Sequence, residues 1–243
     1  MDDAYLHEYE AFENRHWWFV ARRKIILQAI AKHARPNSRW LDVGCGSGVL
    51  LAANKTIVDK VGVDLDPHNV QRGKEKGLDV RTVERGWDFS ELGTFDLITL
   101  CDVIEHVEHE GPAIEAVYRA LRPGGIVLVT VPALMSLWGP HDVVNHHYRR
   151  YTKRSLGRLF DGHRWQTLSS TYFSSLLLPM IWLARKAKNL RGRDTGHDLK
   201  FGNPKVDRAL LSIFSLEAPW LRIGTFPLGS SLLLVCRKRG PVS

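Results

Sequence analysis

The chain has 243 residues, of which 44% are hydrophobic and 25% charged, a composition typical of a globular protein with a large buried core. Its three cysteines lie far apart and form no C-x-x-C pair, which excludes a disulfide-rich secreted scaffold and a zinc ribbon. The net charge is +8, and residues 146–208 hold 14 Lys and Arg against 4 Asp, so the positive charge is regional. Such a region favours an anionic partner or forms a solvated basic face.

The first 36 residues predict an N-terminal helical arm. Apolar residues recur at spacings of three and four between Phe12 and Ile30, which predicts a helix over residues 4–34, and Pro36 follows its end. The acidic start lacks the basic-then-apolar order of a signal peptide. We therefore expect a cytoplasmic protein.

Between Arg39 and Pro132, short apolar runs alternate with helical patterns. This alternation predicts an α/β fold with a Rossmann-like open sheet of parallel strands covered by helices. A loop at 138–151, a helix at 153–160 and a strand at 165–170 follow, and then a helix at 209–222 and a last strand at 230–239. The long separation of the last two strands predicts a helical insertion or lid at 171–225, within a domain spanning 37–243.

A glycine loop follows the first of these strands. Gly44, Gly46 and Gly48 form the loop, and Asp64 ends the next strand, where a carboxylate can accept hydrogen bonds from a ribose diol. Asp42 precedes the loop and would repel a pyrophosphate, but it would attract the ammonium and sulfonium of S-adenosylmethionine. Such a charge pair is worth on the order of 4 kcal/mol at about 4 Å and an effective dielectric of about 20. The predicted cofactor is S-adenosylmethionine, with S-adenosylhomocysteine as its product.

Four ordered segments resemble the class I S-adenosylmethionine-dependent methyltransferases: LDVGCGSG, VGVDLDP, FDLITLCDVIEHV and LRPGGIVLVTVP. The resemblance implies a seven-stranded sheet with a reversed last strand. It places residues near 84–88 beside the adenine, and Cys101 and Asp102 on the side of the transferred methyl group. The cofactor-binding residues that it implies are Asp42, Gly44, Cys45, Gly46, Gly48, Asp64, Leu65, Asp88, Cys101 and Asp102.

Two further motifs narrow the resemblance. The chain has an H-W-W-F and R-R element at residues 16–19 and 22–23, and an H-D-x(n)-H-x-R-R-Y segment at residues 141–151. Both resemble a bacterial methyltransferase group similar to the ubiquinone-pathway O-methyltransferases. The resemblance implies a small-molecule acceptor in a natural-product, lipid or polysaccharide pathway.

The loop at 138–151 starts beyond the carboxyl end of a strand, where ligands enter an open α/β sheet. His141 is the predicted general base for a hydroxyl acceptor, because a neutral imidazole accepts protons near neutral pH. Asp142 would orient His141 or bind the acceptor, and His106 lies beside the expected methyl site. The predicted acceptor-binding residues, whose arginines would clamp an anionic group, are Trp138, His147, Arg149, Arg150 and Tyr151. In the alternative interpretation, the histidines bond to loop backbone and the arginines face water.

A cluster of acids and histidines between Asp102 and Glu110 suggests a metal site. We expect none, because only proximity in sequence groups these residues and zinc needs three or four converging ligands.

The apolar segment at 176–184 and the basic run at 185–193 resemble an interfacial membrane helix. We expect a lid for a lipid-like acceptor, with peripheral contact at the inner membrane face; a core or dimer-interface helix is the alternative. The basic region also leaves RNA or other nucleic-acid methylation as an alternative function. We expect no nucleic-acid partner, because the strand before Asp102 lacks the [ND]-P-P-[YF] clamp.

Overall fold

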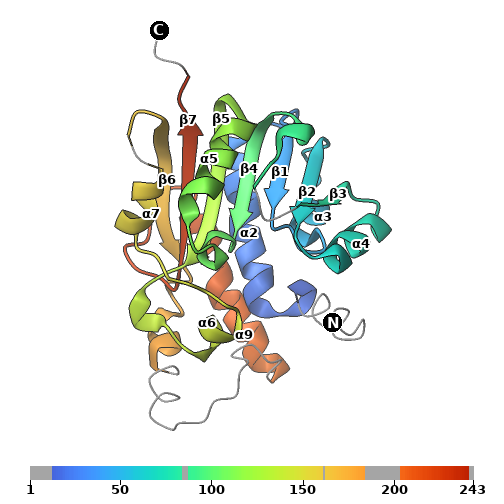
Figure 1. The fold of residues 1–243 in the computed structure, drawn as a ribbon. Coiled ribbons are helices and arrows are strands. Elements are labelled where there is room, and N and C mark those ends of the chain that lie inside the picture. The colour runs from blue at the N-terminus through green and yellow to red at the C-terminus, as the bar shows by residue number, and fades with distance from the viewer. Residues whose placement is uncertain (1–12, 84–86, 161, 184–202, 241–243) are drawn as a thin grey trace.

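The computed structural model describes residues 13–83, 87–160, 162–183 and 203–240. Its centre is a single sheet of seven strands (Figure 1), in the order β3-β2-β1-β4-β5-β7-β6. The strands are β1 (Trp40–Val43), β2 (Lys60–Asp64), β3 (Val80–Thr82), β4 (Phe95–Cys101), β5 (Leu121–Pro132), β6 (Trp165–Phe173) and β7 (Ser231–Lys238).

The strands are parallel except β7, which runs antiparallel to both of its neighbours. This arrangement confirms the predicted Rossmann-like fold with its reversed last strand. The order of strands changes direction between β1 and β4, and ligands bind at such a switch point, beyond the carboxyl ends of the strands.

Helices cover both faces of the sheet (Figure 1). The helices are α2 (Trp17–His33), α3 (Val49–Ala53), α4 (Pro67–Glu75), α5 (Glu110–Ala120), α6 (Pro140–Val144), α7 (Lys153–Leu159), α9 (Pro204–Ser215) and α10 (Glu217–Trp220). Successive strand residues point to opposite faces. Val127 and Val129 therefore pack in one core with α5 and α7, whereas Ile126 and Leu128 pack in a second core with α2 and α9.

The N-terminal helix is interrupted within the described residues, where the sequence predicted a continuous one. Residues 13–15 are helical, but the helix is interrupted at His16, whose extended backbone and ring nitrogen cap the start of α2. The predicted part before residue 13 lies outside the described residues. Ile25, Ile26 and Ile30 of α2 are buried in the second core, so this helix covers the sheet directly.

The segment between β6 and β7 carries the expected helices, with two differences. β6 continues to Phe173, beyond the predicted end at residue 170. The helix predicted at 209–222 is two helices, α9 and α10, which meet at Leu216. The predicted basic run at 185–193 lies outside the described residues.

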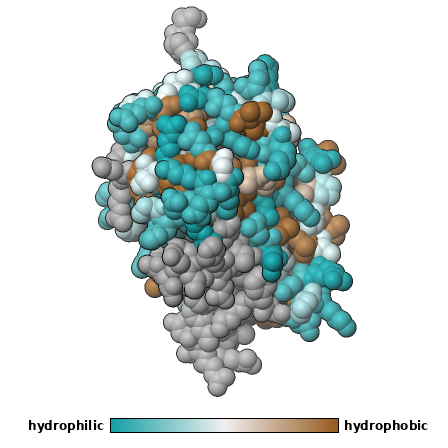
Figure 2. Space-filling model, turned by 90° about the vertical axis from the view of Figure 1, so that its right-hand side faces the viewer, coloured by the Kyte–Doolittle hydropathy of each residue, from teal (hydrophilic) through white to brown (hydrophobic). Residues whose placement is uncertain are grey.

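Apolar residues are spread over the visible surface. On the face at the right of Figure 1, hydrophilic residues predominate and hydrophobic residues occur in small separate groups (Figure 2). Within the described ranges, none of the helices combines the length and the hydropathy that crossing a bilayer requires.

Candidate functional site

The glycine loop lies directly beyond β1. Gly44, Gly46 and Gly48 have φ angles of 67°, 55° and 77°, which glycine adopts without a steric cost. A Cβ atom on Gly44 would lie 2.6 Å from Val103, whereas one on Gly46 would point into open space. The loop is held by Asp64, whose carboxylate accepts a hydrogen bond of 2.8 Å from the Gly46 amide. The backbone of Gly46 therefore faces open space, as the predicted cofactor requires.

Asp42 is buried at the end of β1, where a neighbouring strand supplies a hydrogen-bond donor for its carboxylate. It is paired in register with Thr99 of β4, whose hydroxyl donates a hydrogen bond to the Asp42 carboxylate. The same hydroxyl accepts a hydrogen bond of 2.8 Å from the Trp40 indole. Burial raises the pKa of Asp42 to about 7, against the opposing effects of Thr99 and Arg22. A cationic ligand is therefore favoured by the ionised form of Asp42.

We expect the affinity for S-adenosylmethionine to rise with pH through this titration. Below pH 7 Asp42 is protonated and neutral in the free protein, so the affinity should fall by up to about tenfold per pH unit. Calorimetric titrations between about pH 5.5 and 7.5 measure the effect. Asp42→Asn should bind more weakly at every pH and lose the dependence; the same slope in both proteins would contradict the role of Asp42.

The other expected cofactor residues lie at the same edge of the sheet or near it. Asp64 is half-buried and also accepts hydrogen bonds from the Asp66 amide and the Asn69 side chain, while Leu65 beside it is exposed. Cys45 and Cys101 are half-buried thiols whose pKa values are raised by burial, so both are neutral at physiological pH.

Asp88 makes a local contact. Its carboxylate accepts a hydrogen bond of 2.9 Å from the Ser90 amide, and this interaction lowers its pKa. Its side chain is exposed, and Trp87 beside it packs against the core. The adenine role of Asp88 remains a prediction, and residues 84–86 lie outside the described residues.

The side chain of Arg22, on α2, lies beside the carboxyl end of β4. Its guanidinium lies 2.7 Å from the Asp102 carboxylate and donates a hydrogen bond of 3.0 Å to the Thr130 hydroxyl. It also lies over the Trp18 ring at 5.4 Å. Arg22 was not among the expected site residues, although the H-W-W-F and R-R element contains it. The structure therefore adds an N-terminal cation to the wall of the site.

Arg22→Met should lower the free energy of unfolding by about 1–3 kcal/mol, between the values typical of exposed and buried ion pairs. Lys24→Met, at an exposed position of the same helix, should change it by less than about 0.5 kcal/mol. Urea denaturation of both variants measures the difference. In Arg22→Met/Asp102→Asn, part of the loss should return because the uncompensated carboxylate is gone; strictly additive losses would argue against the pair.

Asp142 organises the loop beyond β5. One of its oxygens accepts hydrogen bonds from His147 Nδ1 at 2.9 Å and Arg150 Nε at 2.8 Å, and the other accepts one from the Gly139 amide at 2.9 Å. Burial alone would raise the pKa of Asp142, but the hydrogen bonds from His147 and Arg150 hold it below its ordinary value. Asp142 thus orients the imidazole of His147, which the sequence did not indicate. Its expected role beside His141 stays a prediction.

The predicted arginine clamp also has protein partners. Arg150 is buried and donates to Asp142 and to the carbonyl of Ala133. Arg149 pairs with Glu110 and donates to the carbonyl of Glu108 at 2.6 Å. Both side chains therefore hold the loop in place. Their role in binding the acceptor stays a prediction.

The remaining loop residues differ in exposure. Tyr151 is buried, and its hydroxyl donates to a Glu110 oxygen at 3.0 Å. Its role in binding the acceptor stays a prediction. Trp138 is half-buried. His141 is half-buried, and its ring centre lies 6.2 Å from that of His147.

His106 and Glu105 follow β4 in a short 3₁₀ turn, Ile104–His106. The His106 ring lies 4.6 Å from the His147 ring. Burial lowers the pKa of His106, with a further contribution from His147, so its imidazole is neutral at pH 7. The structure thus brings His106, His141 and His147 to one place, although they lie on two segments of the chain.

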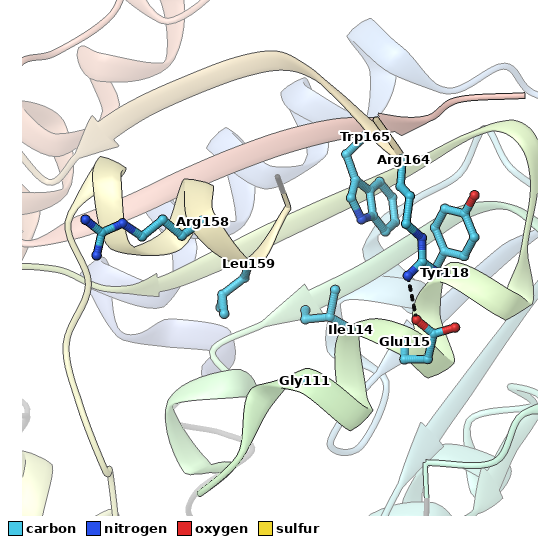
Figure 3. A pocket seen from close by; sticks show the side chains of 8 residues that line it. All are labelled: Gly111, Ile114, Glu115, Tyr118, Arg158, Leu159, Arg164 and Trp165. Atoms are coloured by element: carbon cyan, nitrogen blue, oxygen red, sulfur yellow. Dashed lines mark ion pairs between the residues drawn. The ribbon is translucent and has the colours of Figure 1, made fainter. Parts of the chain in front are cut away.

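A separate pocket of about 220 Å³ lies between α5, α7 and the start of β6 (Figure 3). Arg164 pairs there with Glu115 at 2.8 Å and stacks on the Tyr118 ring at 3.7 Å. None of the expected site residues lines this pocket.

Comparisons with known proteins agree with this geometry. A family model described as a methyltransferase domain matches residues 9–170. The ubiquinone biosynthesis O-methyltransferase of Xanthomonas campestris is 28% identical over 180 residues, covering 62% of this chain and 74% of the relative. The enzyme of the same name from Nitrosococcus oceani is 37% identical over 111 residues, covering 42% of this chain and 47% of the relative.

Solved structures show the same fold. A putative methyltransferase in complex with the Haloferax volcanii Trm112 methyltransferase activator superposes with a TM-score of 0.63 at 18% identity, over 99% of this chain and 97% of that one. A SAM-dependent methyltransferase from Archaeoglobus fulgidus superposes with a TM-score of 0.61 at 15% identity, over 95% of this chain and 99% of that one. At these identities the likeness concerns the fold.

Proposed function

Because this chain belongs to the methyltransferase domain family and is an S-adenosylmethionine-dependent methyltransferase, we propose that it methylates a hydroxyl group of a small-molecule acceptor. Relatives named ubiquinone biosynthesis O-methyltransferase support oxygen as the acceptor atom. The regional positive charge at 146–208 supports an anionic acceptor, and the partly exposed apolar residues Met180 and Trp182 support a lipid-like one.

One observation carries the proposal: the glycine loop, Asp42 and Asp102 meet at the carboxyl ends of β1 and β4. When bound, S-adenosylmethionine supplies an electrophilic methyl group, whose bond to sulfur breaks as the bond to the acceptor oxygen forms, with the electron pair staying on sulfur. The bare backbone of the loop and the carboxylate of Asp64 would position the donor. Alignment of this kind supplies most of the acceleration, with effective molarities of about 10⁵–10⁸ M.

A hydroxyl acceptor must also lose its proton. We assign the proton acceptor to His141, on the loop beyond β5, from which the proton passes to solvent. His141→Gln should lower kcat by about 10²–10⁴-fold without changing the affinity for S-adenosylmethionine. Unchanged turnover would remove His141 from the reaction.

Labelled S-adenosylmethionine and a fractionated cell extract test the proposed function. The label should enter small molecules, and its partition between aqueous and organic phases distinguishes an anionic acceptor from a lipid-like one. Label recovered only in RNA would overturn the proposal. A Gly46→Ala variant, in which a methyl group occupies the cofactor side of the glycine loop, serves as the control for incorporation that does not depend on the site.

A further inference from the structure

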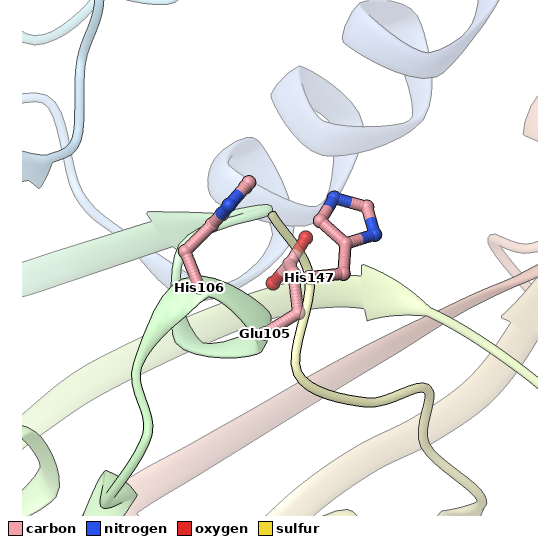
Figure 4. A group of neighbouring side chains, drawn as sticks. All are labelled: Glu105, His106 and His147. Atoms are coloured by element: carbon pink, nitrogen blue, oxygen red, sulfur yellow. The ribbon is translucent and has the colours of Figure 1, made fainter. Parts of the chain in front are cut away.

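Three side chains with metal-binding atoms converge beside the proposed acceptor site. Glu105 and His106 come from the turn after β4, and His147 comes from the loop after α6 (Figure 4). One ligand atom from each of the three lies within 4.8 Å of the other two. The Glu105 carboxylate and the two imidazole rings lie side by side (Figure 4). The expectation that nothing except sequence proximity groups these residues is therefore not met.

Glu105 lacks the compensation that a buried carboxylate requires. Its side chain is fully buried, and among the described residues neither of its oxygens has a hydrogen-bond partner. Arg22 and Arg150, the cations that act on it, direct hydrogen bonds to other groups. Burial and the charge of Asp102 accordingly raise the pKa of Glu105. A buried charge without partners is costly, and coordination of a cation removes the cost.

His147 is prepared for coordination. Its Nδ1 donates to the Asp142 carboxylate at 2.9 Å, an assignment that follows from the hydrogen bond and leaves Nε2 with the lone pair. Asp142 is itself fixed by Arg150 and the Gly139 amide. A carboxylate behind a histidine in this manner fixes the tautomer and raises the basicity of a metal ligand.

His106 completes the donor set. Its imidazole is neutral at pH 7 and its side chain is partly exposed, so an ion can enter from this side. Metal–ligand distances of about 2.0–2.2 Å place ligand atoms closer together than the 4.8 Å within which these three lie, so the group must contract to hold an ion. Two imidazoles and one carboxylate suit zinc and other divalent transition metals, whereas magnesium and calcium prefer sets made of oxygen atoms.

We propose that Glu105, His106 and His147 bind a divalent transition-metal ion such as Zn²⁺, with an open position for an oxygen of the acceptor. Its role in methyl transfer rests on the proposed function. The bound ion lowers the pKa of the acceptor hydroxyl, whose proton passes to His141 or water. The deprotonated acceptor oxygen then attacks the methyl carbon of S-adenosylmethionine, and the bond from that carbon to sulfur breaks with its electron pair staying on sulfur. The substrate class is thus a hydroxyl compound that coordinates through this oxygen.

The test uses the full chain, freed of any affinity tag and dialysed against a chelator. Zn²⁺ is titrated in the absence of cofactor and acceptor, and the metal content is measured after gel filtration. One ion per chain is expected. Glu105→Gln and His147→Gln should bind at least about 30-fold more weakly, since even the loss of a supporting residue costs 10–100-fold. His109→Asn, a histidine of the same loop outside the group, should bind as the unmodified chain does.

Stability without metal separates folding from binding. Glu105→Gln should unfold at the same temperature as the unmodified chain or higher, because the uncompensated carboxylate is gone. Less than half an ion per chain, or equal binding by both variants and the unmodified chain, would overturn the metal site. A chain that transfers methyl groups but takes up no ion refutes this inference alone. A chain that takes up the ion but does not use S-adenosylmethionine refutes the proposed function alone.

Discussion

Replacing Gly46 by alanine should weaken the binding of S-adenosylmethionine by about 100-fold or more, which corresponds to about 2.8 kcal/mol. The new methyl group would enter the open space beside the loop, where the structure places no protein atom within 4 Å. The backbone at this position has a φ of 55°, so alanine also strains the chain by about 1–2 kcal/mol. Calorimetric titration and urea denaturation measure the two effects.

Gly77→Ala is the matched control. Gly77 has a φ of 73°, and a methyl group at this position would likewise meet no atom within 4 Å, but the residue lies at the end of α4 and outside the glycine loop. Its replacement should cost the same stability and leave the affinity unchanged. If both variants lose affinity equally, the loss comes from strain, and the glycine loop is not the binding surface.

Asp142→Ala should be the most destabilising replacement in the loop beyond β5, with an expected loss of about 3–5 kcal/mol in the free energy of unfolding. The change leaves the buried guanidinium of Arg150 without its carboxylate and frees the imidazole of His147. Asp142→Ala/Arg150→Met should recover part of the loss because no unpaired charge remains. An additive double variant would contradict the coupling of the two residues.

The contribution of Asp142 to the free energy of unfolding should decrease as the pH falls. The folded-state pKa of Asp142 is below its ordinary value, so the folded state favours the carboxylate. Its stabilisation is complete above the unfolded-state pKa of about 3.9 and is lost as the pH falls through the folded-state value. The unmodified chain should therefore lose more stability than Asp142→Ala on going from about pH 5 to 3.

The sequence was sufficient for most of the fold. Continuous apolar runs such as those of β4 and β5 are buried on both faces, and this pattern predicts parallel strands between helices. Helix ends were harder to predict. The break at His16 depends on a single side chain that caps α2. The boundary between α9 and α10 at Leu216 was missed because the spacing of apolar residues continues across it.

The candidate site was predictable where it follows from the order of strands. Asp42 lies near the end of a buried strand and the glycine loop comes directly after it, so their place at the sheet edge follows from the topology. The partners of Asp142 did not follow, because sequence spacing does not decide between His141 and His147 as its neighbour. The pairing of Arg22 with Asp102 joins residues 80 positions apart, and only the packing of α2 on the sheet brings them together.

The central claim is that the loop beyond β1 binds S-adenosylmethionine. Calorimetry with the purified chain tests it directly, with S-adenosylhomocysteine as competitor and Asp64→Ala as the deficient variant. We predict saturable binding at one site, competition by the product, and loss of the heat signal in the variant. No heat with S-adenosylmethionine at millimolar concentration, together with saturation by NADH, would contradict the claim.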